Sequence, residues 1–417
     1  MDIATTAATA VGLCRPGFAS AFAAAPDARL AATLRDALAS GAVAGCEFID
    51  AASDSAALGL AMQASARGIR SYAATATENS LFMAEAAYAA GDRGLPVVMT
   101  IADGGQCTRS GEARARVEST VLRDSGWIQL YPEDAQEALD LHIQAFRLAE
   151  ALSCPVMIDV DGFMLGRAPE GLSTPSQARV DAFLPPFERP VMEQFDIGPA
   201  NTASEIGATL ENRYIQHHKQ LRALDLIEAL AQDFKSQFGR ASGGLVRTHS
   251  CEDAETIVVS IGSLVSPIRD VVDELRQEGH RIGLLAICSF RPFPLRQIRD
   301  ALDRASRVVV IERWLAVGMG GILSDGVRKA ACGTDLGTQT VICGLDGRPI
   351  EKQAVFDVLR RACRDELEHL TFLGLDWDVV NRQLEQQRLQ RRARTAAART
   401  LRAFRTARAL DRANGDL

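Results

Sequence analysis

The chain is long, nearly half apolar and mildly acidic. It has 417 residues, of which 47% are hydrophobic, and a formal net charge of −7. This size and composition predict a soluble globular protein with two or more domains. No stretch approaches 18 uninterrupted strongly apolar residues, and the start, Met1-Asp2-Ile3-Ala4, lacks the basic segment of a secretory signal. We therefore expect a cytoplasmic protein rather than a membrane-spanning or secreted one.

Cysteine and histidine are placed unfavourably for metal binding. The nine cysteines stand singly, without any Cys-x-x-Cys pair, and the only neighbouring histidines are His217 and His218. Adjacent residues on a helix point in different directions, so this pair does not have the spacing of metal ligands. The pattern argues against an iron–sulfur or structural zinc site made by this chain alone and predicts reduced structural thiols. We predict no metal site.

Residues 1–165 alternate between helix and strand patterns. Helices are expected at residues 27–38, 53–66 and 79–90, and strands at residues 46–50, 69–74 and 96–102. This alternation predicts an α/β domain with a mostly parallel sheet. The polar segment 103–123 follows the carboxyl end of the last of these strands. Open α/β sheets bind ligands at that end, so we expect a pocket there, with a solvated surface loop as the alternative.

The segment 124–163 is the clearest structural unit. A strand-like run at residues 127–131 precedes a helix that opens on Pro132-Glu133-Asp134 and ends near Cys154-Pro155. A second strand follows at residues 156–160. Strand, helix and strand at this spacing form a βαβ unit, whose parallel strands we expect to be buried in the middle of a doubly wound sheet.

A proline-rich arm separates this domain from a second α/β pattern. Prolines punctuate the segment that follows residue 165, and a helix is expected at about residues 212–238. Strands are then expected at residues 256–260, 281–287, 307–311 and 340–343, with helices at residues 264–278 and 294–303 and a third that ends near residue 331. We therefore predict a first domain over residues 1–165, an arm with its helix over 166–250, a second domain over 251–350 and a helical extension over 351–417.

The C-terminal extension is rich in arginine. From Asp378 onward it holds ten arginines, no lysine and four acidic residues, so its charge is near +6 and the rest of the chain is near −13. Alanine, leucine and glutamine favour a long helix here. No aromatic residues are interleaved in the way that nucleic-acid-binding segments require, so a solvated helix or one that docks on an acidic partner is the preferred interpretation.

Residues 42–350 resemble the alpha subunit of the 2-oxoacid:ferredoxin oxidoreductases, the pyruvate and 2-oxoglutarate synthase family. The family's block D-x-G-W-I-Q-L-x-x-E-x-x-Q-E-A-x-D is matched by Asp124, Gly126-Trp127-Ile128-Gln129-Leu130, Glu133, Gln136-Glu137-Ala138 and Asp140. Further matches follow in the same order at Val160-Asp161-Gly162-Phe163, Phe183-Leu184-Pro185-Pro186, Ser260-Ile261-Gly262-Ser263, Arg291-Pro292-Phe293-Pro294, Gly318-Met319-Gly320-Gly321 and Gly344-Leu345-Asp346-Gly347-Arg348. So many ordered matches are more specific than a single glycine motif.

The resemblance implies a thiamine diphosphate enzyme made of several chains. The first domain would be the doubly wound pyrimidine-binding domain, and the second would resemble the C-terminal domain of transketolase. A beta subunit would hold the diphosphate and Mg²⁺, and iron–sulfur clusters would lie on that chain and on a ferredoxin-like subunit, with a gamma subunit and ferredoxin as further partners. The thiazolium ring of the cofactor acts as the electron sink when a 2-oxoacid loses carbon dioxide.

The residues implied for the cofactor differ from the family pattern. The family's pyrimidine-activating glutamate, in a Ser-Glu pair, falls on Asp54 of Ser53-Asp54. Aspartate is shorter by one methylene, so the same hydrogen bond requires a shift of roughly 1.5 Å. The family's Ser-Gln-Gly cofactor loop becomes Thr77-Glu78-Asn79, which makes Glu78 the alternative working carboxylate.

The residues implied for the substrate differ more. The family's substrate-contacting threonine falls on Ala25, and its Asn-Arg pair, whose arginine binds the substrate carboxylate, falls on Asp103-Gly104. Loss of that arginine removes the strongest carboxylate contact of such a pocket. Arg109 or Arg114, in the same polar segment, are the candidates to replace it.

Three functions are compatible with these departures. The chain could belong to an oxidoreductase that accepts an unusual 2-oxoacid or related acyl donor. It could belong to a complex that keeps thiamine chemistry without electron transfer, as a decarboxylase or carboligase. It could also be a non-catalytic scaffold subunit. Cofactor content and cluster absorbance of the assembled complex would distinguish the three.

Overall fold

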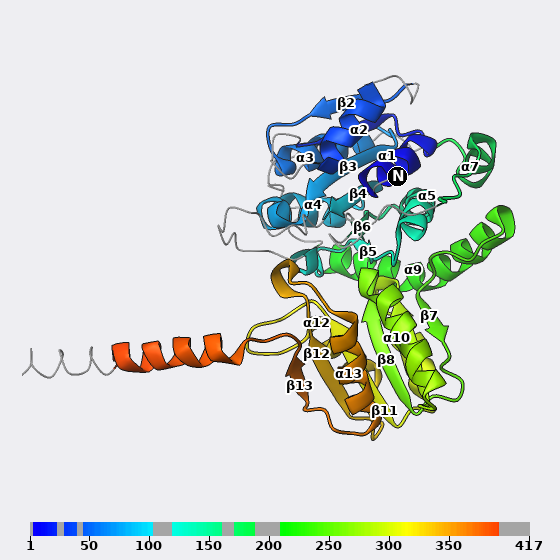
Figure 1. Ribbon diagram of the computed structural model, residues 1–417. Helices are drawn as coiled ribbons and strands as arrows, with labels where there is room; N and C mark the ends of the chain where they lie inside the picture. Colours follow the sequence, from blue (N-terminus) through cyan, green and yellow to red (C-terminus); the bar gives the residue numbers. More distant parts are fainter. Residues whose placement is uncertain are drawn as a thin grey trace, which may run out of the picture. The chain divides into compact units, whose positions relative to one another are not determined.

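The first sheet has seven strands, and six of them come from the first 160 residues (Figure 1). The computed structural model describes residues 3–22, 29–39, 45–102, 119–160, 171–187 and 209–391. The strand order is β10-β5-β6-β4-β3-β1-β2, with parallel pairing throughout except between β10 and β5. The strand bounds are β1 Phe18–Ala21, β2 Glu47–Asp50, β3 Ser71–Ala76, β4 Val97–Ala102, β5 Ile128–Leu130, β6 Val156–Val160 and β10 Ser289–Arg291.

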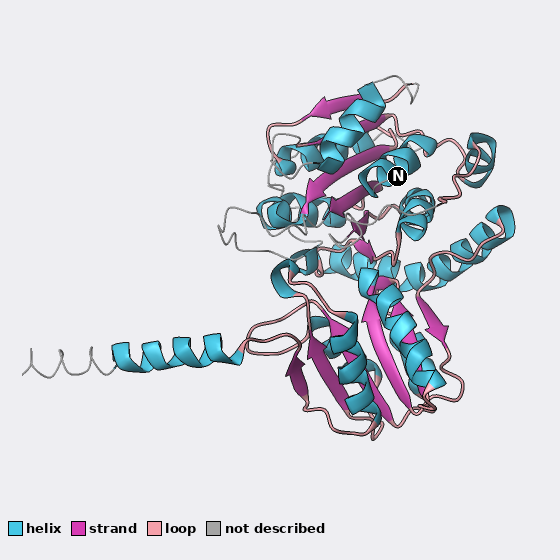
Figure 2. Cartoon of the chain, viewed as in Figure 1, coloured by secondary structure: helices cyan, strands magenta, loops and turns pink. Residues whose placement is uncertain are grey.

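Helices cover both faces of this sheet, so the predicted doubly wound architecture is confirmed (Figure 2). Helices α1 (Ile3–Leu13), α2 (Arg29–Ala39) and α5 (Ala135–Leu152) pack on one face. Helices α3 (Asp54–Ala66) and α4 (Ala84–Arg93) pack on the other. Strands β5 and β6 with α5 between them form the predicted βαβ unit. Every residue of the two strands is buried.

Two N-terminal elements were not predicted. The alanine-rich start forms α1, and Phe18–Ala21 forms β1 between β2 and β3. Arg15, Pro16 and Gly17 lie in the turn between α1 and β1. The short strand β1 has little propensity of its own, and pairing on both sides stabilises it.

The helix predicted at residues 79–90 begins later than expected. Residues Thr77–Met83 form a 3₁₀ turn, η1, and the α-helix α4 starts at Ala84. Asparagine and serine side chains compete for backbone hydrogen bonds, which favours such a turn over an α-helical start. The sequence Thr77-Glu78-Asn79 therefore lies in the turn that directly follows β3.

The family-like block on α5 joins the first sheet to later parts of the chain. Glu137 Oε1 accepts a hydrogen bond from the Gly243 amide at 3.1 Å, and both Glu137 oxygens bind the guanidinium of Arg247. Asp140 binds Arg240 through two bonds of 2.6 and 2.8 Å. Glu133 binds Arg247 and Arg269 at 2.9 and 2.7 Å. Two buried carboxylates of α5 and a partly buried one just before the helix thus meet three arginines from beyond residue 238.

The local sequence explains why Glu137 faces inward. Asp134 caps α5, because its carboxylate accepts the Glu137 amide at 2.8 Å. The Glu137 carboxylate in turn accepts the amide of Glu133 at 2.7 Å, as in a capping box. Burial opposes ionisation of Glu133, but its bond to Arg269 and the charge of Arg247 outweigh that effect and lower its pKa. Glu133 and Glu137 therefore take part both in the hydrogen bonds at the start of α5 and in the ion pairs of the carboxylate cluster.

A series of buried hydrogen bonds links β3 and β4 to α5. Tyr72 donates a hydrogen bond to Thr100 Oγ1 at 2.7 Å, and Thr100 Oγ1 lies 2.7 Å from His142 Nε2. His142 Nδ1 lies 2.6 Å from the Ala138 carbonyl, which can only accept, so Nδ1 carries the proton and Nε2 accepts from Thr100. Burial lowers the pKa of His142 to about 4, which agrees with a neutral ring.

The second sheet has six strands in the order β13-β12-β11-β8-β9-β7. The bounds are β7 Val246–His249, β8 Thr256–Ile261, β9 Ile282–Ile287, β11 Arg307–Glu312, β12 Thr338–Ile342 and β13 Leu370–Phe372. Helices α11 (Leu295–Leu302) and α12 (Ile322–Ala330) share a core with one face, while α10 (Val265–Gln277) contacts β9 and α13 (Lys352–Cys363) contacts β11. The predicted elements of this region are confirmed. Three further elements lie outside the predicted limits of 251–350, namely β7, α13 and β13, and β13 is a strand within the extension predicted to be helical.

The glycine-rich turn before α12 is shaped by a buried acid. Glu312, at the end of β11, accepts the amides of Leu323 and Ser324 at 2.7 and 2.9 Å and so caps α12. Burial raises the pKa of Glu312, although these bonds favour the charged form. A Cβ on Gly321 would lie 2.0 Å from Glu312 Oε1. Only glycine fits beside this carboxylate.

The remaining elements are the predicted arm helix and the C-terminal helix. Helix α9 (Thr209–Phe238) confirms the helix expected at residues 212–238, and a short helix α7 (Gln177–Phe183) packs on it through Phe183, Phe234 and Phe238. Contacts divide the chain into Met1–Thr371 and Phe372–Leu417. In the second unit residues 377–391 are helical, as predicted for the start of the arginine-rich tail. The four-segment domain division remains a prediction.

Candidate active site at the carboxyl edge of the first sheet

Asp54 is a buried acid at the edge of the first sheet. It is the first residue of α3, and Ser53 caps that helix by accepting the Ala56 amide at 3.2 Å. Asp54 is 7% exposed. Helix α3 follows β2, so its N-terminus lies at the carboxyl edge of the parallel strands, where α/β sheets bind ligands.

Thr75 is a hydrogen-bond partner of Asp54. The Thr75 hydroxyl donates to Asp54 Oδ1 at 2.6 Å, and Thr75 is 6% exposed. Thr75 is the penultimate residue of β3. A short O–H···O⁻ contact between two buried groups is a charge-assisted hydrogen bond, stronger than a neutral one. The strand predicted at residues 69–74 stops one residue short of this threonine, which the sequence did not identify as a site residue.

Asp159 is a second buried acid at the same edge. In the register of the sheet Thr75 pairs with Ile101, and Ile101 pairs with Asp159, so the three residues lie in one row across β3, β4 and β6. Asp159 is 6% exposed. Two strand spacings separate Thr75 from Asp159 by about 10 Å between backbones. An acid inside the buried run Val156–Val160 is the signal that could have identified it from the sequence.

The other predicted site residues are only partly described. The backbone of Thr77, Glu78 and Asn79 forms the start of η1, directly after the strand that carries Thr75. The structure therefore brings this turn and Asp54 to the same edge of the sheet. The structure does not describe the side chains of Thr77, Glu78 and Asn79. Ala25, Gly104, Arg109 and Arg114 lie outside the described residues, so their predicted roles remain predictions.

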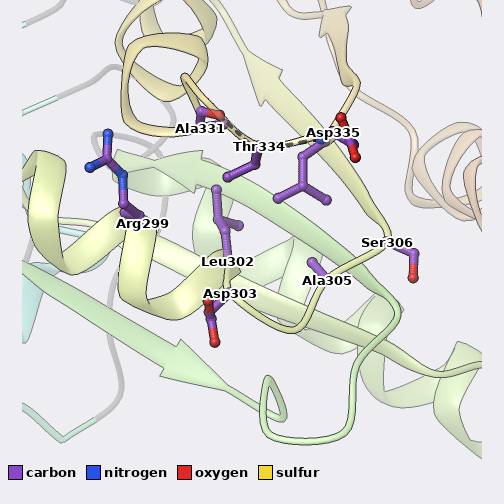
Figure 3. A pocket seen from close by; sticks show the side chains of 9 residues that line it. Arg299, Leu302, Asp303, Ala305, Ser306, Ala331, Thr334 and Asp335 are labelled. Carbon is purple, nitrogen blue, oxygen red and sulfur yellow. Dashed lines mark hydrogen bonds between the residues drawn. The ribbon is translucent and has the colours of Figure 1, made fainter.

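Hollows also lie elsewhere among the described residues. A crevice of about 370 Å³ is enclosed by the loops that precede β11 and β12, with Arg299, Leu302 and Thr334 in its wall (Figure 3). Its polar groups bond locally, since Thr334 donates to the Ala331 carbonyl at 2.7 Å and Arg299 to the Ala330 carbonyl at 2.8 Å. It lies at the amino ends of the strands, opposite to the edge where α/β sheets bind ligands.

A larger groove of about 700 Å³ lies where β10 joins the first sheet. The described part of its lining includes four cationic side chains and two acidic ones: Arg123, Arg213, Arg291 and Lys329 against Asp124 and Asp325. Asp54 and Thr75 lie outside its lining, so the groove is separate from the candidate site.

The described residues contain neither a metal-binding cluster of side chains nor a helix that could cross a membrane. Among them, no group of three or more histidine, cysteine, aspartate or glutamate side chains could hold a metal ion. Within the same residues, no helix has both the length and the apolarity that crossing a bilayer requires. The described cysteines are free thiols, and burial raises the pKa of Cys154 and Cys343 to about 12.

Comparison with solved structures agrees with this architecture. A 2-oxoglutarate:ferredoxin oxidoreductase from Magnetococcus marinus superposes with a TM-score of 0.61 at 16% identity, over 87% of this chain and 65% of the other. This chain thus spans just under two thirds of that relative. A split-gene transketolase superposes with a TM-score of 0.51 at 14% identity, over 87% of this chain and 99% of the other. At such identities the likeness concerns the fold alone.

Comparison at the sequence level is more specific. Residues 9–234 match the thiamine diphosphate-binding domain of pyruvate flavodoxin/ferredoxin oxidoreductase, and residues 254–355 match core domain II of pyruvate:ferredoxin oxidoreductase. The pyruvate synthase subunit PorA of Methanosarcina barkeri is 34% identical over 73% of this chain and 77% of its own length. PorA of Methanothermobacter thermautotrophicus is 35% identical over 79% of this chain and 86% of its own length. The chain therefore belongs to the pyruvate flavodoxin/ferredoxin oxidoreductase family.

Proposed function

We propose that the chain is the alpha-type subunit of a multi-chain, thiamine diphosphate-dependent 2-oxoacid oxidoreductase. The assembled enzyme would decarboxylate a 2-oxoacid oxidatively and pass the electrons to iron–sulfur clusters and ferredoxin. Family membership supports this proposal, as do relatives named as subunits of pyruvate synthase that this chain covers over 77% and 86% of their length. The functional observation that carries it is the buried Asp54 carboxylate at the carboxyl edge of the first sheet.

The residues at this edge fit the pyrimidine end of thiamine diphosphate. Recognition of an aminopyrimidine needs a carboxylate that bonds a ring nitrogen and exchanges a proton with it. Asp54 provides a carboxylate on the first turn of a helix, in a nearly dry setting, with one oxygen already held by Thr75. When bound, the cofactor would supply the electron sink for decarboxylation. Asp54 would hold the proton at its carboxylate, and Thr77, Glu78 and Asn79 would line the ring.

The substrate contacts of this enzyme would differ from the family pattern. Ala25 and Gly104 replace the threonine and arginine that the family places against the substrate. Arg109 or Arg114 would then bind the substrate carboxylate, since a guanidinium matches a carboxylate with two parallel hydrogen bonds. Such a pocket suits an unusual 2-oxoacid.

The remaining parts of the enzyme would come from partner chains. A beta subunit would hold the diphosphate and Mg²⁺, iron–sulfur clusters would lie on that chain and on a ferredoxin-like subunit, and a gamma subunit would complete the assembly. The site would then be complete only in the hetero-oligomer, which we expect in the cytoplasm, without nucleic acid or membrane.

The experiment that tests this function is anaerobic purification of the assembly through this chain from its native host. We expect co-purifying chains, bound thiamine diphosphate, a visible iron–sulfur spectrum and 2-oxoacid-dependent reduction of ferredoxin. Thiamine diphosphate without clusters would instead indicate a decarboxylase or carboligase. A colourless chain without thiamine would contradict the proposal.

A further inference from the structure

We propose that Thr75 is the positioning residue that fixes the working orientation of the Asp54 carboxylate. This inference rests on the proposed thiamine diphosphate chemistry and adds to it a residue outside the family pattern found in the sequence. Thr75 touches Asp54 and acts through it. The function of its hydroxyl is to select one rotamer of the short acidic side chain.

The geometry gives Thr75 control over one oxygen of the acid. The hydroxyl lies 2.6 Å from Asp54 Oδ1, and both side chains are buried at the same edge of the sheet. Threonine is branched at Cβ, so its χ1 is stiff, and its backbone is held by pairing with Ile101 of β4, while β1 pairs with β3 up to the preceding residue, Ala74. The donor is therefore in place before any ligand binds, which is the condition for preorganisation.

The backbone of Asp54 is fixed independently of Thr75. Ser20 of β1 donates to the Ala57 carbonyl in the first turn of α3 at 2.7 Å, and Ser53 caps the helix. With the helix start tied to β1, the Thr75 hydroxyl acts on the side-chain torsions of Asp54 and not on its backbone.

This arrangement accounts for an aspartate at a position where the family pattern has glutamate. A glutamate would carry its carboxylate about 1.5 Å farther from α3. The shorter aspartate keeps its carboxylate close to the sheet, within reach of the penultimate residue of β3. Asp54 and Thr75 thus form a matched pair, in which the hydroxyl favours the rotamer of Asp54 that keeps Oδ1 within hydrogen-bond distance.

The test compares Thr75→Val, Thr75→Ser and Thr100→Val in the enzyme assembled with its partner chains. Valine keeps the shape of threonine without the hydroxyl, and serine keeps the hydroxyl. Thr100 is a matched control, because it is a buried threonine of the neighbouring strand β4 whose hydroxyl bonds Tyr72 and His142 instead. Thiamine diphosphate affinity, KM and kcat are measured for each variant.

We expect Thr75→Val to lower kcat by about ten- to a hundredfold, the range for loss of a hydrogen bond to a charged group. KM for the 2-oxoacid and the Kd of thiamine diphosphate should stay within about threefold, because the cofactor's main anchors are elsewhere. Thr75→Ser should recover most of kcat. Thr100→Val should lower thermal stability and leave kcat per assembled enzyme unchanged.

A double variant distinguishes action through Asp54 from general packing. If Thr75 acts only by orienting Asp54, Thr75→Val should have no further effect on the residual kcat of Asp54→Ala. Full activity in Thr75→Val, or equal losses in the valine and serine variants, would overturn the proposal. Should the valine variant fail to assemble, Thr75→Ala removes the same hydroxyl with a smaller side chain, and its kcat is read in the same way.

Failure of the proposed function would look different. A wild-type assembly without thiamine diphosphate or turnover would reject the chemistry itself. A wild-type assembly with both, combined with an active Thr75→Val variant, would reject only the role of Thr75.

Discussion

The α5 block and the carboxyl edge of the first sheet differ in how they depart from the family pattern. The block keeps Glu133, Glu137 and Asp140, and the structure shows these acids paired with Arg240, Arg247 and Arg269. The carboxyl edge has Asp54 in place of the expected glutamate, with Thr75 bound to it. The residues that made the family recognisable therefore hold the scaffold together, while the residues proposed to do chemistry are the ones that differ. A family resemblance can therefore rest on residues that stabilise the fold, even where the residues proposed for catalysis differ from the family pattern.

The largest expected effect on the scaffold comes from Glu137→Ala. This change removes an acid that binds Arg247 and two backbone amides, and it leaves a partly buried guanidinium without its main partner. Breaking a buried ion pair typically costs about 3–5 kcal/mol. We expect a loss of that size in the free energy of unfolding, measured by chemical denaturation.

The control for Glu137→Ala is Glu255→Ala, which removes an acid from a half-exposed ion pair with Arg281. Exposed pairs contribute about 0–1 kcal/mol. Equal destabilisation by the two variants would show that the α5 cluster does not hold the scaffold in the way described.

A smaller effect is expected from acid, through His142. Its pKa is about 4 in the folded chain against an ordinary value of 6.5. Between about pH 6.5 and pH 4, His142 is protonated in the unfolded chain and neutral in the folded chain. The free energy of unfolding therefore falls as the pH drops across that window. The loss attributable to His142 is about 3 kcal/mol at most.

The contribution of His142 is isolated by comparison with His142→Gln, which keeps a donor and an acceptor but does not titrate. Denaturation midpoints are measured for both chains between pH 7 and pH 4. The difference in stability between them should change across this window. Parallel curves would remove His142 as the source of the acid sensitivity.

The smallest of the expected effects concerns the substrate carboxylate. If Arg109 or Arg114 binds it, replacing that residue with glutamine should raise the apparent KM by an amount equivalent to about 1.5–3 kcal/mol, the range for a charged hydrogen bond. Steady-state kinetics of the assembled enzyme with its 2-oxoacid provide the measurement. Unchanged constants in both single variants and in the double variant would exclude both arginines.

The sequence predicted architecture better than site geometry. Apolar periodicity and flanking prolines identified β5, α5 and β6 to within a few residues, because local pattern and burial agree there. Strand β10 could not be predicted, because Ser289–Arg291 pairs with β5 across more than 150 residues of chain and local sequence carries no signal for such pairing. Strand β1 was missed because its small residues gain their structure from two neighbours.

In the candidate site, too, local sequence predicted a residue but not its long-range contacts. Asp54 was found by its position in a motif, but its bond to Thr75 depends on the arrangement of α3 against β3, which no spacing along the chain reveals. Asp159 was not singled out from the sequence, and only the register places it in the row of Thr75.

The measurement that most directly tests this account is the turnover of an Asp54→Ala enzyme assembled with its partner chains. Asp54 is proposed to serve chemistry and not the scaffold, so the variant should assemble, retain thiamine diphosphate and melt close to the wild type, while turnover falls by about a hundred- to ten-thousandfold, the range for loss of a proton-transfer group. Turnover close to that of the wild type, in an assembly that retains its cofactor, would contradict the assignment of Asp54 as the working acid.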